Sequence, residues 1–121
     1  AGGSGAGLFE AAAEYSESSG SKVWAIGVDS DQYNTAAPEV QEYILTSMLK
    51  RVDVAVYEIV KAQQDGTFTA GNVVYDLSVD GVGYSTSGGF LTDEQIATIE
   101  DYKQQIIDGA IEVPTTPEAA G

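Results

Sequence analysis

The chain has 121 residues, and its 19 acidic against 5 basic side chains give a formal net charge of -14 at pH 7. This length is typical of one domain or of a piece of one. The acidic excess argues against binding to nucleic acid or to anionic lipid, because both need clustered lysine and arginine. It fits either a solvated surface or an adaptation to high salt, and the composition leaves both open.

Cysteine and histidine are both absent. Their absence excludes disulfides within the chain, zinc sites built from these residues, and catalysis of the Ser-His-Asp or Cys-His kind. We therefore expect no catalytic residue, no metal and no cofactor, although chemistry based only on carboxylates or lysine stays compatible with the composition. The sequence shows no signal peptide, and its apolar stretches fall far short of the roughly 18 residues that a spanning helix needs.

Helix and strand signals alternate along the chain, which predicts an α/β fold with a mostly parallel sheet and flanking helices. The glycine-rich start, residues 2–7, is typical of a turn that leads from a strand into a helix, but the strand itself is missing. We therefore expect the sequence to begin inside a domain. The predicted helices span 5–19, 51–64 and 92–108, and the predicted strands span 22–28, 43–48, 72–77, 82–85 and 110–113. The segment 43–48 is also compatible with the start of a helix.

Local signals support these boundaries. Gly20, Gly66 and Gly109 follow the three helices, and Thr92 with Glu94 or Gln95 is typical of a capping box. Asp80-Gly81 predicts a hairpin turn between the strands that flank it. The remaining expectations are a polar loop over 30–39, a loose tail over 114–121, Trp24 in the core, one apolar stripe of Leu8, Phe9, Ala12 and Tyr15, and another of Val52, Ala55, Val56, Ile59 and Val60.

The glycine-rich start is the first feature that could bind a ligand. A glycine-rich turn ahead of a helix lets backbone N–H groups approach an anion or a hydroxyl-rich molecule. The segment is not a phosphate-binding P-loop, because no Lys-Ser or Lys-Thr pair follows it, and Leu8 stands where a dinucleotide fingerprint needs its third glycine. A tight structural turn explains it equally well.

Asp29 and Lys50 are the second and third features. Each follows an apolar run, and ligands of open α/β sheets bind outside the carboxyl ends of the strands. A carboxylate in that position can accept hydrogen bonds from both hydroxyls of a ribose. The alternatives are a loop cap for Asp29 and a surface ion pair for Lys50, which would contribute little to stability. We expect both side chains, with the backbone around Gly3, to converge on one concavity.

Two motifs carry a family resemblance, Gly27-Val28-Asp29-Ser30-Asp31-Gln32 and Thr46-Ser47-Met48-Leu49-Lys50-Arg51. From Ala1 to about Pro114 the chain resembles the C-terminal half of the basic membrane protein family, the solute receptors of ABC importers. The resemblance implies part of a two-lobed type I periplasmic-binding-protein fold, with elements of both lobes in 1–113. It implies ligand contacts from Gly3, Asp29 and Lys50, with Gly2, Ser4, Asp31 and the hydroxyls of Thr46 and Ser47 as weaker candidates.

The same resemblance implies a function. The receptor would capture a nucleoside, in the first place a purine nucleoside, without chemistry, and would pass it to an ABC permease. It would be a lipoprotein anchored in the cell envelope, in the periplasm or on the outer face of the membrane, and the missing N-terminal part of the protein would complete the cleft. Gly81-Val82-Gly83 would be structural and near the hinge. The alternatives are an interaction or assembly protein that keeps the receptor fold, and a carboxylate- or lysine-based enzyme of flavodoxin-like shape.

Overall fold

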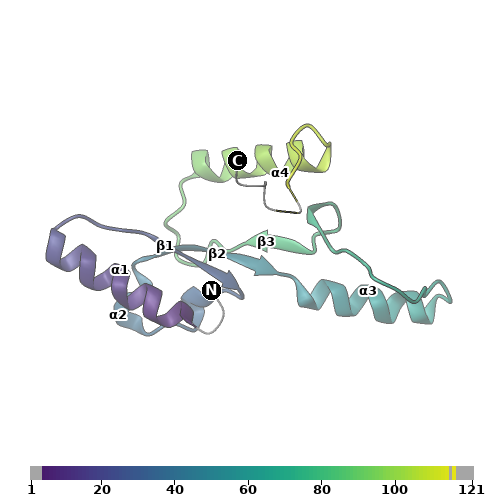
Figure 1. The fold of residues 1–121 in the computed structure, drawn as a ribbon, viewed down its shortest axis with the longest axis horizontal. Coiled ribbons are helices and arrows are strands. Elements are labelled where there is room, and N and C mark those ends of the chain that lie inside the picture. Colours follow the sequence, from purple (N-terminus) through teal and green to yellow (C-terminus); the bar gives the residue numbers. More distant parts are fainter. Residues whose placement is uncertain (1–3, 115, 117–121) are drawn as a thin grey trace. The chain divides into compact units, whose positions relative to one another are not determined.

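The computed structural model describes residues 4–114 and residue 116 (Figure 1). The chain forms two compact units, Ala1–Leu91 and Thr92–Gly121, and each is described by itself. Helices and strands alternate as expected, and the α/β class is confirmed. Among the described helices, none combines the length and the apolar composition that crossing a membrane requires.

The sheet of the first unit has three strands in the order β1-β2-β3. They are β1 (Ala25–Asp29), β2 (Ile44–Lys50) and β3 (Val82–Tyr84). β1 and β2 are parallel, whereas β3 is antiparallel to β2, so the described sheet is mixed. The parallel pair sends both of its carboxyl ends to the same edge of the sheet, and this arrangement positions the candidate site.

Helix α1 (Gly5–Ser19) has the predicted bounds. Gly20 ends it in the left-handed conformation (φ 71°), which glycine adopts without steric penalty. The predicted apolar stripe is only half right, because Phe9 and Ala12 are buried but Leu8 and Tyr15 are 50% and 60% exposed. The buried face also includes Ala13 and Ser16, whose small side chains let α1 pack closely. The polar Ser16 is accommodated there because its hydroxyl donates to the carbonyl oxygen of Ala12 and accepts from the N–H of Val23.

The core lies where α1 meets the beginnings of β1 and β2. The segment predicted as a polar loop, 30–39, contains the short helix η2 (Gln32–Asn34) and the start of α2 (Pro38–Gln41). Trp24 precedes β1 and is 40% exposed, so its predicted place in the core is wrong. It packs instead against the ring of Phe90, with 5.0 Å between the ring centroids. The buried hydrophobic residues of the core are Phe9, Ala12, Ala13, Ala25, Val40, Tyr43 and Ile44.

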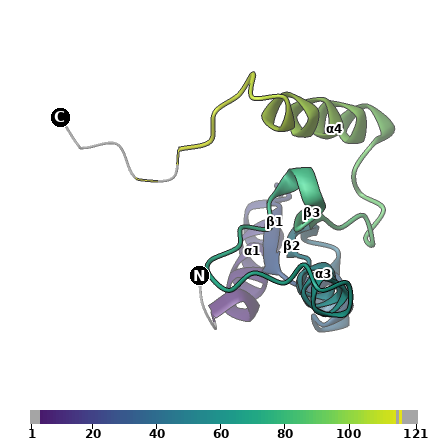
Figure 2. The same cartoon turned by 90° about the vertical axis from the view of Figure 1, so that its right-hand side faces the viewer.

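Helix α3 (Val52–Gln64) continues from the end of β2 and points away from the sheet (Figure 1), and Figure 2 shows it end-on. It confirms the predicted helix, with Arg51 as its N-cap residue. None of its residues is buried, and Val52, Val56, Ile59 and Val60 of the predicted apolar stripe are exposed. The stripe exists in the sequence, but no described part of the chain buries it.

The strand predicted over 72–77 is wrong. That segment is irregular and leads into η3 (Leu77–Val79), where the carboxylate of Asp76 accepts a hydrogen bond of 2.9 Å from the N–H of Ser78. Asp80-Gly81 does turn the chain, with Asp80 in the left-handed conformation (φ 53°), but it ends η3 rather than closing a hairpin. β3 pairs with β2 instead of with the preceding segment, because strand pairing depends on the packing of the whole unit and not only on a local turn.

The second unit contains α4 (Asp93–Ile107), whose predicted capping box is confirmed. The hydroxyl of Thr92 accepts from the N–H of Gln95 at 3.2 Å, and the side-chain oxygen of Gln95 accepts from the N–H of Thr92 at 2.9 Å. The strand predicted over 110–113 is wrong, since those residues are irregular after the turn at Gly109. The predicted loose tail, 114–121, lies outside the described residues apart from positions 114 and 116.

Candidate functional site

Asp29 and Lys50 meet at the edge of the sheet where the two parallel strands end. Asp29 is the last residue of β1 and pairs in register with Leu49, the residue before Lys50, which ends β2. The Lys50 Nζ atom lies 2.7 Å from the Asp29 Oδ1 atom. The expectation that these two side chains lie together is confirmed, and Lys50 is the last residue of β2.

The backbone of Asp29 adopts the left-handed conformation, with φ at 74°. This conformation is uncommon outside glycine, although aspartate tolerates it better than most residues. Residues held in such sparsely populated conformations cluster at ligand-binding sites, where the surrounding structure imposes them. The N–H of Ser30 donates to the carbonyl oxygen of Val28 at 3.0 Å and closes a tight turn around Asp29.

Gln32, which the sequence did not single out, supports the Asp29 turn through two hydrogen bonds. Its side-chain oxygen accepts from the N–H of Val28 at 2.8 Å, and its own N–H donates to the hydroxyl of Ser47 at 3.1 Å. Gly27 and Gly5 make room for it, because a Cβ atom at these positions would lie 3.0 Å from Gln32 Oε1 and 2.9 Å from Gln32 Nε2. The end of β1, the middle of β2 and the start of α1 therefore gather around this one side chain. Two features of the sequence indicate this role: the place of Gln32 at the end of the Gly27–Gln32 motif, and Gly27 itself, five residues earlier.

The weaker candidates have other partners or lie elsewhere. The Asp31 Oδ2 atom accepts hydrogen bonds from the amide of Asn34 and from the hydroxyl of Ser87. Thr46 donates to the carbonyl oxygen of Ser85, and Ser47 is fully buried against Gln32, so both hydroxyls serve the protein's own backbone. Ser4 is exposed immediately before α1, whereas Gly2 and Gly3 lie outside the described residues.

Arg51, the base beside Lys50, forms an ion pair with Asp53 in the first turn of α3. Its guanidinium donates to both carboxylate oxygens of Asp53, at 3.2 and 3.0 Å. These hydrogen bonds raise the pKa of Arg51 and lower the pKa of Asp53 from their ordinary values. Lys50 is therefore the base that the sheet edge presents beside Asp29.

The Asp29–Lys50 pair is open to solvent, because each side chain is 60% exposed. Ion pairs of such exposure stabilise a fold by about 1 kcal/mol at most. What the pair offers is chemistry, since an ionised carboxylate accepts several hydrogen bonds and an ammonium donates three. Among residues 4–114 and 116, no group of three or more acidic side chains is arranged to hold a metal ion.

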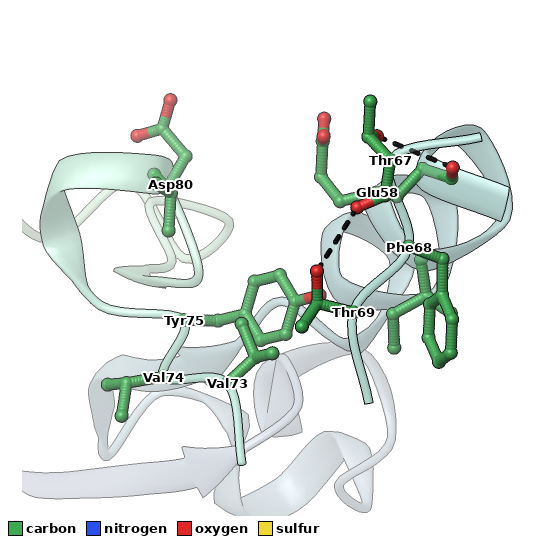
Figure 3. Close-up of a pocket in the computed structure, with 11 residues that line it drawn as sticks. Glu58, Thr67, Phe68, Thr69, Val73, Val74, Tyr75 and Asp80 are labelled. Carbon is green, nitrogen blue, oxygen red and sulfur yellow. Dashed lines mark hydrogen bonds between the residues drawn. The ribbon is translucent and has the colours of Figure 1, made fainter. Parts of the chain in front are cut away.

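A hollow of about 590 Å³ lies on another part of the first unit (Figure 3). Its walls come from the second half of α3, the segment 67–75 and η3. They carry aromatic and aliphatic groups such as Phe68, Val73 and Tyr75, together with the acids Glu58 and Asp80. It shares no lining residue with the Asp29–Lys50 pair, and its lining contains no base.

The chain matches the family model for PnrA-like ABC transporter substrate-binding proteins over residues 1–117. It is 39% identical over 124 residues to a CD4+ T-cell-stimulating antigen of Listeria monocytogenes, covering 97% of this chain and 35% of that protein. It is 35% identical over 123 residues to the ABC transporter nucleoside-binding protein BmpA of Lactococcus lactis, covering 95% and 34%. An uncharacterized lipoprotein of Pyrococcus abyssi is 41% identical over 78 residues, covering 64% and 18%.

The fold agrees with these matches. A solute-binding protein of an ABC transporter system from Aeropyrum pernix K1 superposes with a TM-score of 0.60 at 27% identity, covering 93% of this chain and 38% of that one. The chain thus spans about a third of the length of the curated relatives that cover most of it. It belongs to the PnrA-like family of ABC transporter substrate-binding proteins.

Proposed function

We propose that the protein to which this chain belongs captures a nucleoside, in the first place a purine nucleoside, between two lobes. The observation that carries the proposal is the Asp29–Lys50 pair, which stands exposed at the carboxyl ends of adjacent parallel strands. Ligands of open α/β sheets bind outside this edge. The name of the Lactococcus lactis relative, a nucleoside-binding protein, supports this ligand class.

The ribose is the part of a nucleoside that suits this pair. Two neighbouring hydroxyls can donate to the two oxygens of one carboxylate, and hydrogen bonds to an ionised group are the stronger kind. In our proposal Asp29 accepts from the ribose hydroxyls, while Lys50 holds that carboxylate in place and donates to a ligand oxygen. The left-handed backbone of Asp29 fixes the direction in which its carboxylate leaves the strand.

The other proposed contacts come from the start of the chain and from outside it. Backbone N–H groups around Gly3 would approach the ligand, with Gly2, Ser4 and Asp31 as weaker contributors. Residues 1–113 would supply elements of both lobes, and the longer remainder that the relatives possess would complete the pocket. An ABC permease would receive the nucleoside, as the family implies. The lipoprotein among the relatives supports anchoring in the cell envelope, in the periplasm or on the outer face of the membrane.

Calorimetry on the full-length protein tests this function. The variant Asp29→Asn keeps the size of the side chain but removes its charge, so guanosine should bind about 10- to 100-fold more weakly. Asp53→Asn is the matched control, because it also removes an exposed aspartate from an ion pair, at the start of α3 rather than at the strand ends. Unchanged guanosine affinity in Asp29→Asn, or an equal loss in both variants, would refute the proposal.

A further inference from the structure

We propose that Asp31 and Ser87 form a positioning pair that holds Asp29 in its strained, ligand-ready conformation. This inference rests on the proposed function and gives Asp31, a weaker candidate for ligand contact, a positioning role together with Ser87. Asp31 follows Asp29 by two residues, whereas Ser87 is 56 positions further along the chain than Asp31. The hydroxyl of Ser87 donates to Asp31 Oδ2, which also accepts from the side-chain amide of Asn34 at 2.7 Å.

Ser87 belongs to a segment that is itself fixed to the sheet, the strap of residues 85–91. Before Ser87, the N–H of Ser85 donates to the carbonyl oxygen of Ser47 at 2.9 Å, and Thr46 donates to the carbonyl oxygen of Ser85 at 2.7 Å. After Ser87, the ring of Phe90 packs between aromatic neighbours, as its contacts with Trp24 and with Tyr33 show. A hydroxyl held from both sides can serve as an anchor for the loop that carries Asp29.

The other oxygen of Asp31 is informative. Oδ1 is buried, and no described residue gives it a hydrogen bond. A buried acceptor without a partner is unfavourable, and such atoms are rare enough in folded proteins to call for an explanation. The carboxylate is oriented by the two donors on Oδ2, and its orientation keeps the turn in one place. We infer that the benefit of holding the loop in one position outweighs the free-energy cost of the unpaired oxygen.

The loop between Asp29 and Gln32 is thereby held at three points. The side-chain oxygen of Gln32 accepts from the N–H of Val28, the residue before Asp29, and the N–H of Gln32 donates to the hydroxyl of Ser47. Asp31 adds the attachment to the strap. A strained residue keeps its conformation only where the surroundings over-determine it. Without the attachment to Ser87, Asp29 should relax toward an ordinary backbone conformation, and its carboxylate should no longer point in the direction that the ligand needs.

Guanosine binding to the full-length protein tests the pair by calorimetry. Ser87→Ala should weaken binding about three- to tenfold, since it removes one of two donors that orient Asp31. Ser87→Thr keeps the hydroxyl and should bind nearly as the unmodified protein does. Thr86→Ala, an exposed neighbour within the strap, is the control and should leave the affinity unchanged.

A double-mutant cycle separates positioning from general stability. If Ser87 acts through Asp29, Ser87→Ala should change guanosine affinity less than about twofold in an Asp29→Asn background. The same loss in both backgrounds would overturn the inference while leaving the proposed function intact. If Asp29→Asn alone does not weaken guanosine binding, the proposed function fails. The positioning role of Asp31 and Ser87 is then tested by a measurement that does not depend on guanosine.

That measurement is hydrogen exchange at the N–H of Ser30, which closes the turn around Asp29. It needs no ligand. Exchange should accelerate in Ser87→Ala and stay unchanged in Thr86→Ala and Ser87→Thr, because only the first variant releases Asp31. Equal exchange in all three variants would overturn the inference, whatever the affinities show.

Discussion

Asp29 combines a left-handed backbone, an exposed carboxylate and an ion pair with Lys50. A role in stability explains these features poorly, because an ion pair with both partners 60% exposed contributes little to folding. A role in binding explains them better, since an accessible acid and base at a strand end are what a polar ligand requires. The two roles make opposite predictions for the loss of the Lys50 charge.

Lys50→Met removes the ammonium and keeps most of the side-chain stem. We expect the free energy of unfolding to change by less than about 1 kcal/mol, as for other exposed ion pairs. Guanosine affinity should fall about tenfold, because a charged donor is lost from the site. Lys61→Met, which removes an exposed charge from α3, is the control for both measurements. A large loss of stability with unchanged affinity would make the pair structural.

How much of the site can be predicted from the sequence depends on how far apart the contacting residues lie along the chain. Asp29 and Lys50 were predicted because each follows an apolar run, and parallel strands bring their carboxyl ends to one edge of the sheet. The contact of Asp31 with Ser87 could not be predicted, because the two residues are 56 positions apart and no local signal in the sequence indicates their proximity. Ser47 looked like a ligand hydroxyl, yet it is fully buried against Gln32, and only the packing of β1 on β2 reveals this.

At the scale of elements, the close approach of β1 to β2 depends on Gly27. A Cβ atom at this position would lie 2.4 Å from the Ser47 hydroxyl and 3.0 Å from Gln32 Oε1. Both neighbours are held by hydrogen bonds, so neither can move away freely. The glycine therefore leaves room for the Gln32 side chain to reach the N–H of Val28, the residue before Asp29.

Gly27→Ala should destabilise the protein by about 1–3 kcal/mol, the usual range for overpacking a well-packed site. Gly83→Ala in β3 is the matched control, because its Cβ atom would meet nothing within 4 Å, and it should change stability little. Denaturant unfolding of the full-length protein measures both variants. An equal, small change in the two would mean that β1 and β2 can separate to admit the methyl group.

The elements that the sequence predicted best are those with local end signals. α1 and α4 match their predicted bounds closely, because Gly20 and the Thr92–Gln95 capping box act within one helical turn. The strand predicted over 72–77 is wrong because its partner, across Asp80-Gly81, pairs with β2 instead. That choice depends on the whole sheet, and a turn signal of two residues cannot encode it.

In the molecule as a whole, large apolar side chains stand exposed on α3 and on the segment that follows it. Val56, Ile59 and Val60 on α3 are exposed, as are Phe68, Val73 and Val74 near the hollow of Figure 3. Soluble proteins seldom leave large contiguous apolar patches uncovered. Since the relatives are about three times as long, we propose that segments corresponding to their additional length cover this region.

The 121-residue chain, purified alone, should therefore not behave as a compact, cooperative monomer. We expect it to bind a hydrophobic dye and to self-associate, more strongly at high salt, where the repulsion of its net charge of -14 is screened. Replacing Val56 and Val60 together by lysine should reduce both effects, whereas the same change at two exposed polar positions of α3, Gln63 and Gln64, should not. Cooperative thermal unfolding with monomeric sedimentation would contradict this expectation.

Recognition of a ribose by Asp29 is the central claim, and calorimetry with guanosine and with guanine tests it most directly. In the full-length protein, Asp29→Ala should weaken guanosine binding by about 2–4 kcal/mol, because it removes hydrogen bonds between a charged acceptor and the two hydroxyls. Guanine lacks the ribose, so its affinity should change much less. Equal losses for the nucleoside and the free base would show that Asp29 does not read the sugar.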